Sequence, residues 1–143
     1  MTISPQATIS ETPHRVVVGV DGSEGSDRAL AWAAAEAERS GAILQVVTAF
    51  KPGYEFITPD EVRESMLQVI ARATSQVAAL APTVKVEGDY HEGSPAEVLI
   101  NAGHHADLLV VGSRGQGGFR GLLLGSVSQQ CSLHADCPVV IVP

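Results

Sequence analysis

A glycine-rich segment contains the residues whose types and spacing could bind a phosphate. Six of the fourteen positions from 112 to 125 are glycine. Glycine has no Cβ, so the backbone N–H groups of such a segment can approach an anion closely. Arg114 and Arg120 add positive charge, and Ser126 and Ser128 add hydroxyl donors where a helix is expected to begin. Taken alone, the pattern fits a phosphate site and an unliganded surface loop equally well.

Two common phosphate-binding patterns do not fit this segment. The P-loop requires G-x4-G-K-[ST], and the segment contains no lysine. The dinucleotide fingerprint G-x-G-x-x-G fails because Gly115 and Gly117 are followed by Arg120. That fingerprint also belongs after the first strand of a fold, whereas this segment comes late in the chain. A phosphate site here must therefore use another spacing of glycines.

The elements that would position this segment alternate between strands and helices. Apolar runs with few polar interruptions predict buried strands, and one alternating run predicts a strand near a sheet edge. The five strands are expected at 15–20, 42–49, 83–90, 107–112 and 138–142. Helices are expected at 26–40, from the capping box Thr58-Pro59-Asp60-Glu61 to Leu80, from Ser94 to His104, and from Gly125-Ser126 to Ala135.

This order predicts an α/β fold with one domain. We expect an open five-stranded parallel sheet, Rossmann-like and doubly wound, with strand order 3-2-1-4-5 and helices on both faces. Such sheets bind ligands outside the carboxyl ends of the strands, at the point where the strand order reverses. The segments after the first and fourth strands should therefore form the site. Residues 1–14 are expected to be a flexible N-terminal extension.

Composition excludes several classes of function. The chain has 143 residues, with 16 Asp+Glu against 9 Lys+Arg and a net charge of -7. This acidic balance argues against general nucleic-acid binding and against binding to anionic lipid. No apolar stretch approaches the roughly 18 residues that span a bilayer, and the N-terminus lacks a signal-peptide pattern, so we expect a cytoplasmic protein. The two cysteines fit neither a disulfide framework nor a zinc site.

The spacing Gly112-x2-Gly115-x9-Gly125-Ser126 resembles the nucleotide-binding pattern of the ATP-binding branch of the universal stress protein family. The resemblance covers residues 15–143 and includes the segments VVVGVDGSEGSDRAL, HEGSPAEVL and CPVVIVP. It implies a universal stress protein domain over 15–143, with ATP as its ligand. It also implies a nucleotide-dependent regulatory function in a stress response. The branch of the family that does not bind ATP lacks these glycines.

The resemblance implies a set of nucleotide-binding residues. Asp21 would contact adenine or ribose, or lie near a metal, although an aspartate here is also typical of a helix cap. Val47 would contact adenine through its backbone, although it equally suits a core position. Mg2+ or Mn2+ would be chelated mainly by phosphate oxygens and water. The ribose and phosphate groups would be lined by Gly112, Ser113, Arg114 and Gly115, and by Gly125, Ser126, Val127 and the Ser128 hydroxyl, with Gly19 and Val111 beside them.

Other functions remain open within this resemblance. Members of the family tend to dimerise through the last strand, which implies a homodimer through Pro138–Val142 and would cover an apolar sheet edge. A slow ATPase or autophosphorylating enzyme is one alternative, although the absence of a lysine from the segment argues against strong catalysis. A protein that binds cyclic AMP is another. A phosphoacceptor receiver domain is disfavoured, because Asp21 is the single acid after the first strand and no lysine follows Lys85.

Overall fold

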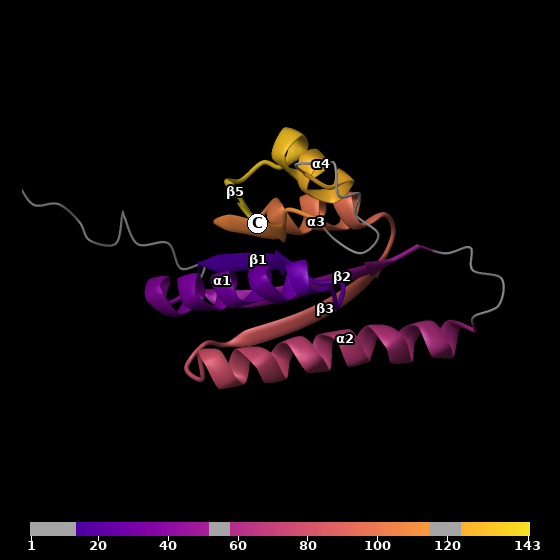
Figure 1. Cartoon of the computed structure of the whole chain (residues 1–143), viewed down its shortest axis with the longest axis horizontal. Helices are drawn as coiled ribbons and strands as arrows, with labels where there is room; N and C mark the ends of the chain where they lie inside the picture. The colour runs from indigo at the N-terminus through magenta and orange to yellow at the C-terminus, as the bar shows by residue number, and fades with distance from the viewer. Residues whose placement is uncertain (1–13, 52–57, 115–123) are drawn as a thin grey trace, which may run out of the picture.

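The computed structural model of the chain describes residues 14–51, 58–114 and 124–143. Within these ranges strands and helices alternate as the sequence predicts (Figure 1). No helix in these ranges is long and apolar enough to cross a membrane. The elements are β1 (Arg15–Gly19), α1 (Glu24–Ser40), β2 (Ile43–Phe50), α2 (Pro59–Leu80), β3 (Val86–Glu92), α3 (Pro95–Gly103), β4 (Leu108–Gly112), α4 (Ser126–His134) and β5 (Val139–Val142).

The five strands form one parallel sheet in the order β3-β2-β1-β4-β5, which confirms the predicted topology. The chain runs outward from β1 to β3 and then returns to β4 on the other side of β1. β1 and β4 are paired in register, with Val18 opposite Val110. Their carboxyl ends are therefore adjacent, and the strand order reverses between them.

Helices cover both faces of the sheet, and each face has its own apolar core. Val16 and Val18 of β1 point into a core shared with α1 and α2, whereas Val17 points into a core shared with α3 and α4. This alternation follows from the period of two along a strand. In Figure 1, α3 and α4 accordingly lie on one side of β1, and α2 lies on the other.

α2 and α3 begin where the sequence predicts, whereas α1 begins at Glu24, two residues before the predicted Ser26. Ser23, Thr58 and Ser94 are the N-caps of α1, α2 and α3, and each side chain accepts a hydrogen bond from a backbone N–H of the first turn. Thr58 and Glu61 form the predicted capping box. α4 differs, because its N-cap is Gly125 and no side chain caps it.

One strand is shifted relative to the prediction. β3 begins at Val86 and ends at Glu92, whereas the alternating pattern placed it at 83–90. The difference arises from the end of α2, where Val84 N donates to Ala81 O at 3.1 Å and closes a turn. Lys85 O then accepts from Leu44 N at 2.9 Å, so pairing with β2 begins only there.

Candidate functional site

The chain leaves β1 through a tight turn that Asp21 organises. One carboxylate oxygen of Asp21 accepts hydrogen bonds from Ser23 N at 2.9 Å and from Ser23 Oγ at 2.5 Å. Gly22 between them has a φ of 82°, a left-handed conformation that glycine adopts readily. Because Ser23 is the N-cap of α1, the carboxylate fixes the residue at which the helix begins. Ser23 is therefore the residue that caps α1, and Asp21 holds this cap in place instead of capping the helix itself.

The first turn of α1 lies directly against the end of β4. A Cβ added to Gly25 would be 2.5 Å from the carbonyl oxygen of Arg114. A Cβ added to Gly112 would be 2.9 Å from the carbonyl oxygen of Gly25. Both distances are too short for any side chain, so the two backbones meet here because both residues are glycine. This contact joins the Asp21 turn to the start of the glycine-rich segment.

Ser113 connects the two ends of the glycine-rich segment. Its carbonyl oxygen accepts from Gly125 N at 2.5 Å and from the Ser128 hydroxyl at 2.9 Å. The same hydroxyl lies 3.0 Å from Gly125 O, and Ser128 is 1% exposed. Ser113 N in turn donates to Val142 O of β5 at 2.8 Å. The start of α4 is therefore fixed beside the end of β4.

We call the place where the first turn of α1, the end of β4 and the start of α4 meet the junction. The first turn of α4 presents backbone N–H groups there. The first helical hydrogen bond runs from Gln129 N to Gly125 O at 3.0 Å, so the N–H groups of residues 126–128 precede the helical ladder. Neither a capping side chain nor an acidic residue is present in this first turn. Unpaired N–H groups and the positive end of the helix dipole together favour an anion.

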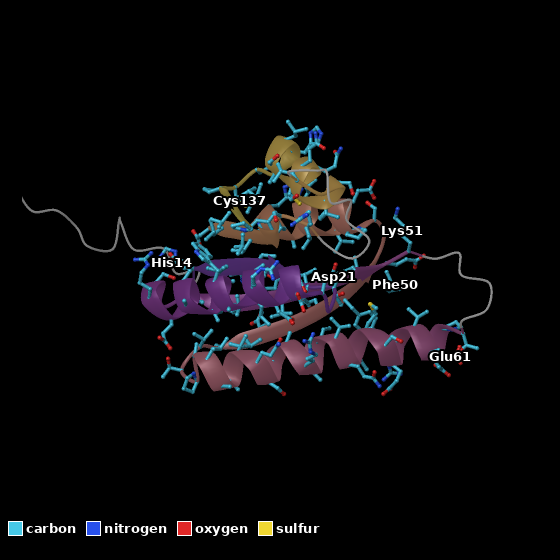
Figure 2. All side chains as sticks on the ribbon, in the orientation of Figure 1. His14, Asp21, Phe50, Lys51, Glu61 and Cys137 are labelled. Atoms are coloured by element: carbon cyan, nitrogen blue, oxygen red, sulfur yellow. The ribbon has the colours of Figure 1, made fainter. Side chains whose placement is uncertain are left out.

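The structure brings together most of the residues that the sequence singled out. Gly25 of α1 contacts Gly112 and Arg114 at the end of β4. Asp21 holds the start of the same helix through Ser23, and Ser113 is bonded to the start of α4. Gly115 lies outside the described residues. Figure 2 shows Asp21 at the same end of the molecule as Phe50 and Lys51, where β2 ends, with His14 at the opposite end.

Three of the predicted residues lie within strands of the sheet, and Val47 and Val111 are core positions. Val47 is 1% exposed, and its carbonyl oxygen accepts from Val20 N at 2.9 Å. Val111 is 3% exposed. A Cβ on Gly19 would lie 2.6 Å from Leu99 Cδ1, so this glycine lets α3 pack closely on the sheet. These three residues belong to the strands that support the site.

Sequence reasoning missed Gly25, whose backbone packs against the end of β4 where a Cβ would not fit. The available signal was its position, because glycine is disfavoured inside a helix by about 1 kcal/mol relative to alanine. A glycine retained in the first turn of α1 therefore indicates a close approach. The partner of that approach lies more than eighty positions away, and no local pattern reveals it.

The donor set suits an anion better than a bare metal ion. In the ranges that the structure describes, no group of three or more His, Cys, Asp or Glu side chains could bind a metal. The Asp21 carboxylate is engaged by Ser23, and the donors that remain are the backbone N–H groups at the start of α4. Arg114, at the end of β4, has an exposed side chain. A divalent cation would therefore arrive with a phosphate ligand, whose oxygens would chelate it.

An open, doubly wound α/β sheet, whose switch point brings the ends of β1 and β4 close to the start of α4, defines the class of the domain. The model of the universal stress protein family matches residues 13–143. A universal stress protein of Thermus aquaticus is 36% identical over 132 residues, covering 89% of this chain and 96% of the relative. The chain belongs to the universal stress protein family.

Solved structures agree with this assignment. A universal stress protein in complex with cAMP is 31% identical, with a TM-score of 0.75, covering 92% of this chain and 97% of that chain. A universal stress protein family protein of Arabidopsis thaliana with AMP bound is 25% identical, with a TM-score of 0.61 and 91% coverage of each chain. Other relatives are longer: this chain covers 48% of one from Mycobacterium tuberculosis.

Proposed function

We propose that this chain is a cytoplasmic regulatory protein that binds ATP at the carboxyl ends of β1 and β4. The observation that carries the proposal is the junction at Ser113, which fixes the uncapped start of α4 beside the end of β4. Two relatives were solved with adenine nucleotides, cAMP and AMP, and both share this fold. An acidic protein can bind a polyphosphate in this way because backbone N–H groups provide the recognition.

In this proposal, two parts of the junction bind different parts of the nucleotide. Asp21 and the backbone near Val47 would contact the adenosine, and residues 112–115 would line the ribose and α-phosphate. The N–H groups of residues 126–128 would bind the β- and γ-phosphates. We assign the backbone N–H of Ser128 to this role instead of its hydroxyl, because the hydroxyl already donates to a carbonyl oxygen. Bound Mg2+ would be chelated by phosphate oxygens and water.

Extraction of bound nucleotide tests the proposal directly. The purified protein is denatured, and the released nucleotide is identified by chromatography. Calorimetric titration with ATP, AMP and cAMP then gives their affinities.

Gly125→Val should weaken ATP binding at least tenfold, because a bulky side chain would occupy the position of a phosphate. Ser132→Val, on the same helix but away from the junction, should bind ATP normally. Wild-type protein that releases no nucleotide and binds none of the three would contradict the function.

Cyclic AMP is a second candidate ligand, because the relative solved with cAMP is 31% identical to this chain. A cyclic phosphate has no β- or γ-phosphate, so its binding should not depend on the start of α4. Competition between ATP and cAMP separates the two candidates. Tighter binding of cAMP, unaffected by Gly125→Val, would make cyclic AMP the ligand.

We also propose a homodimer that pairs β5 with its copy. β5 is at one edge of the sheet, its one neighbour there is β4, and all four of its residues are half-buried. An apolar edge strand of this kind is stabilised by pairing with another strand. We expect a dimer mass by light scattering at tens of micromolar protein. A monomer mass at that concentration would refute the pairing.

A further inference from the structure

We propose that Arg72 of α2 is a positioning residue for the nucleotide site. It would hold the first turn of α1 so that Asp21 and the end of β4 keep their relative positions. The inference rests on the proposed nucleotide binding and adds a residue that neither touches the ligand nor belongs to the glycine-rich segment.

The Arg72 guanidinium makes two contacts with the turn that follows β1. One nitrogen donates to Gly22 O at 3.3 Å, and the other lies 2.8 Å from Asp27 Oδ2. These two partners lie on either side of Ser23, the residue that Asp21 fixes as the N-cap of α1. A single side chain from α2 therefore fastens both the strand exit and the first turn of the helix.

The same turn touches the glycine-rich segment. Gly25 lies between the two partners of Arg72 in the sequence, and its backbone contacts Arg114 O and Gly112. A movement of this turn must therefore separate Gly25 from the end of β4 or move the end of β4 with it. The contacts run from Arg72 through the first turn of α1 to the residues assigned to ribose and α-phosphate.

Arg72 donates the side-chain hydrogen bonds that reach this turn from the described part of α2. A small hollow lies between the two helices, lined by residues that include Val20, Ser26, Val69 and Gln76. Arg72 spans the edge of this hollow with a side chain that is 51% exposed, and Asp27 is 29% exposed. An ion pair with this exposure adds little to global stability. Loss of Arg72 should therefore loosen the turn without unfolding the domain.

Calorimetric titration of Arg72→Gln with AMP and ATP tests the inference. We expect both affinities to fall by the same factor, about two- to fivefold. The factor is the same because AMP and ATP share the adenosine and α-phosphate that the held residues would contact. Asp27→Asn should reproduce only part of this loss, because Arg72 keeps its hydrogen bond to Gly22 O. The double variant should be no weaker than Arg72→Gln, which already removes both contacts. Arg72→Lys should recover part of the affinity through its contact with Asp27.

Arg63→Gln is the matched control, since Arg63 is an exposed arginine of the same helix. It removes the same charge and should bind both nucleotides like wild type. Equal weakening by Arg63→Gln would show a general charge effect and overturn the inference. A loss for ATP that greatly exceeds the loss for AMP would also overturn it, because the β- and γ-phosphates are assigned to α4.

Hydrogen exchange of the nucleotide-free protein gives a readout that is independent of binding. Amides of residues 21–28 should exchange faster in Arg72→Gln than in wild type, with an unchanged thermal midpoint. A lowered midpoint in both Arg72→Gln and Arg72→Lys would indicate a merely structural role and contradict the inference. Normal nucleotide affinity in Arg72→Gln would refute the inference while leaving the proposed function intact. Wild-type protein that binds no nucleotide would defeat both.

Discussion

At the scale of single residues, the junction depends on what two glycines lack. Gly25 and Gly112 allow two backbones to meet at distances that a Cβ would forbid. The site is thus shaped by backbone atoms, which cannot change rotamer. This arrangement suits a ligand that is recognised mainly through N–H groups.

Gly25→Ala tests this contact. The added methyl group would lie 2.5 Å from Arg114 O, so the first turn of α1 or the end of β4 must shift. We expect a destabilisation of about 1–3 kcal/mol, typical of overpacking, and a loss of nucleotide affinity of at least tenfold. Urea unfolding and calorimetric titration measure the two effects.

Gly41→Ala is the control for a loss of stability alone. Gly41 has a φ of 71° at the end of α1, and a Cβ there would meet nothing within 4 Å. Alanine in this conformation should cost roughly 1–2 kcal/mol without touching the site. If Gly25→Ala bound nucleotide as well as Gly41→Ala does, the contact would not matter for binding.

The residues of the site divide clearly into those that the sequence could predict and those that it could not. Asp21 and Ser113 follow strands at the switch point, and that position is visible in the alternation of apolar runs. The partners of Ser128 and Arg72 are not visible, because each pairing joins residues that are distant in the sequence. Serine and arginine are also common on helix surfaces, so neither residue type draws attention by itself.

At the scale of elements, α4 differs from the other three helices. Serine or threonine side chains cap α1, α2 and α3, whereas α4 begins at a glycine with no side-chain cap. A cap would satisfy an N–H group that the proposed ligand needs. The uncapped start therefore leaves these N–H groups for the phosphate of the proposed ligand, which would take the place of a capping side chain.

Ser126→Asp tests this interpretation. A carboxylate in the first turn should interact favourably with the helix dipole and stabilise the ligand-free protein by about 0.3–1 kcal/mol. The same charge should repel the β- and γ-phosphates, so ATP affinity should fall more than AMP affinity. Thermal unfolding and titration give both values.

Ser132→Asp places the same charge in the last turn of α4. There the dipole is unfavourable to an acid, so a slight destabilisation and normal ATP binding are expected. Normal ATP affinity in Ser126→Asp would show that the start of α4 does not bind phosphate.

Element boundaries show where local sequence signals are sufficient. Capping signals located Thr58 and Ser94 because they report hydrogen bonds within four residues. β3 was placed three residues too early because its start depends on a turn at Ala81 and on pairing with Leu44. An alternating pattern indicates which face of a strand is buried, but it carries no information about where a partner strand begins.

At the scale of the whole molecule, a buried thiol makes stability depend on pH. Cys131 is fully buried in the core under α4, and this burial raises the pKa of its thiol from 9.0 to about 11. The folded protein therefore keeps a proton that the unfolded chain loses between pH 9 and pH 11. Stability from this group is complete below pH 9, and about 2–3 kcal/mol of it should be lost by pH 11.

Urea unfolding between pH 7 and pH 11 measures this loss. Other groups also titrate in that range, so the comparison is with Cys131→Ala, which should be less stable at pH 7 but decline less steeply above pH 9. Parallel curves for the two proteins would rule out a contribution from the Cys131 thiol. The thiol should also resist alkylation at neutral pH, because the thiolate is the reactive form.

The hydrogen bond from Ser113 N to Val142 O joins the loop junction to the last strand. In the two proposals, the nucleotide binds near Ser113 and the dimer forms through β5, which contains Val142. Dimerisation and nucleotide binding would then form a single thermodynamic cycle. Any factor by which dimerisation raises nucleotide affinity must equal the factor by which nucleotide strengthens the dimer. Through this one backbone hydrogen bond, a higher nucleotide concentration would then allow the dimer to form at a lower protein concentration.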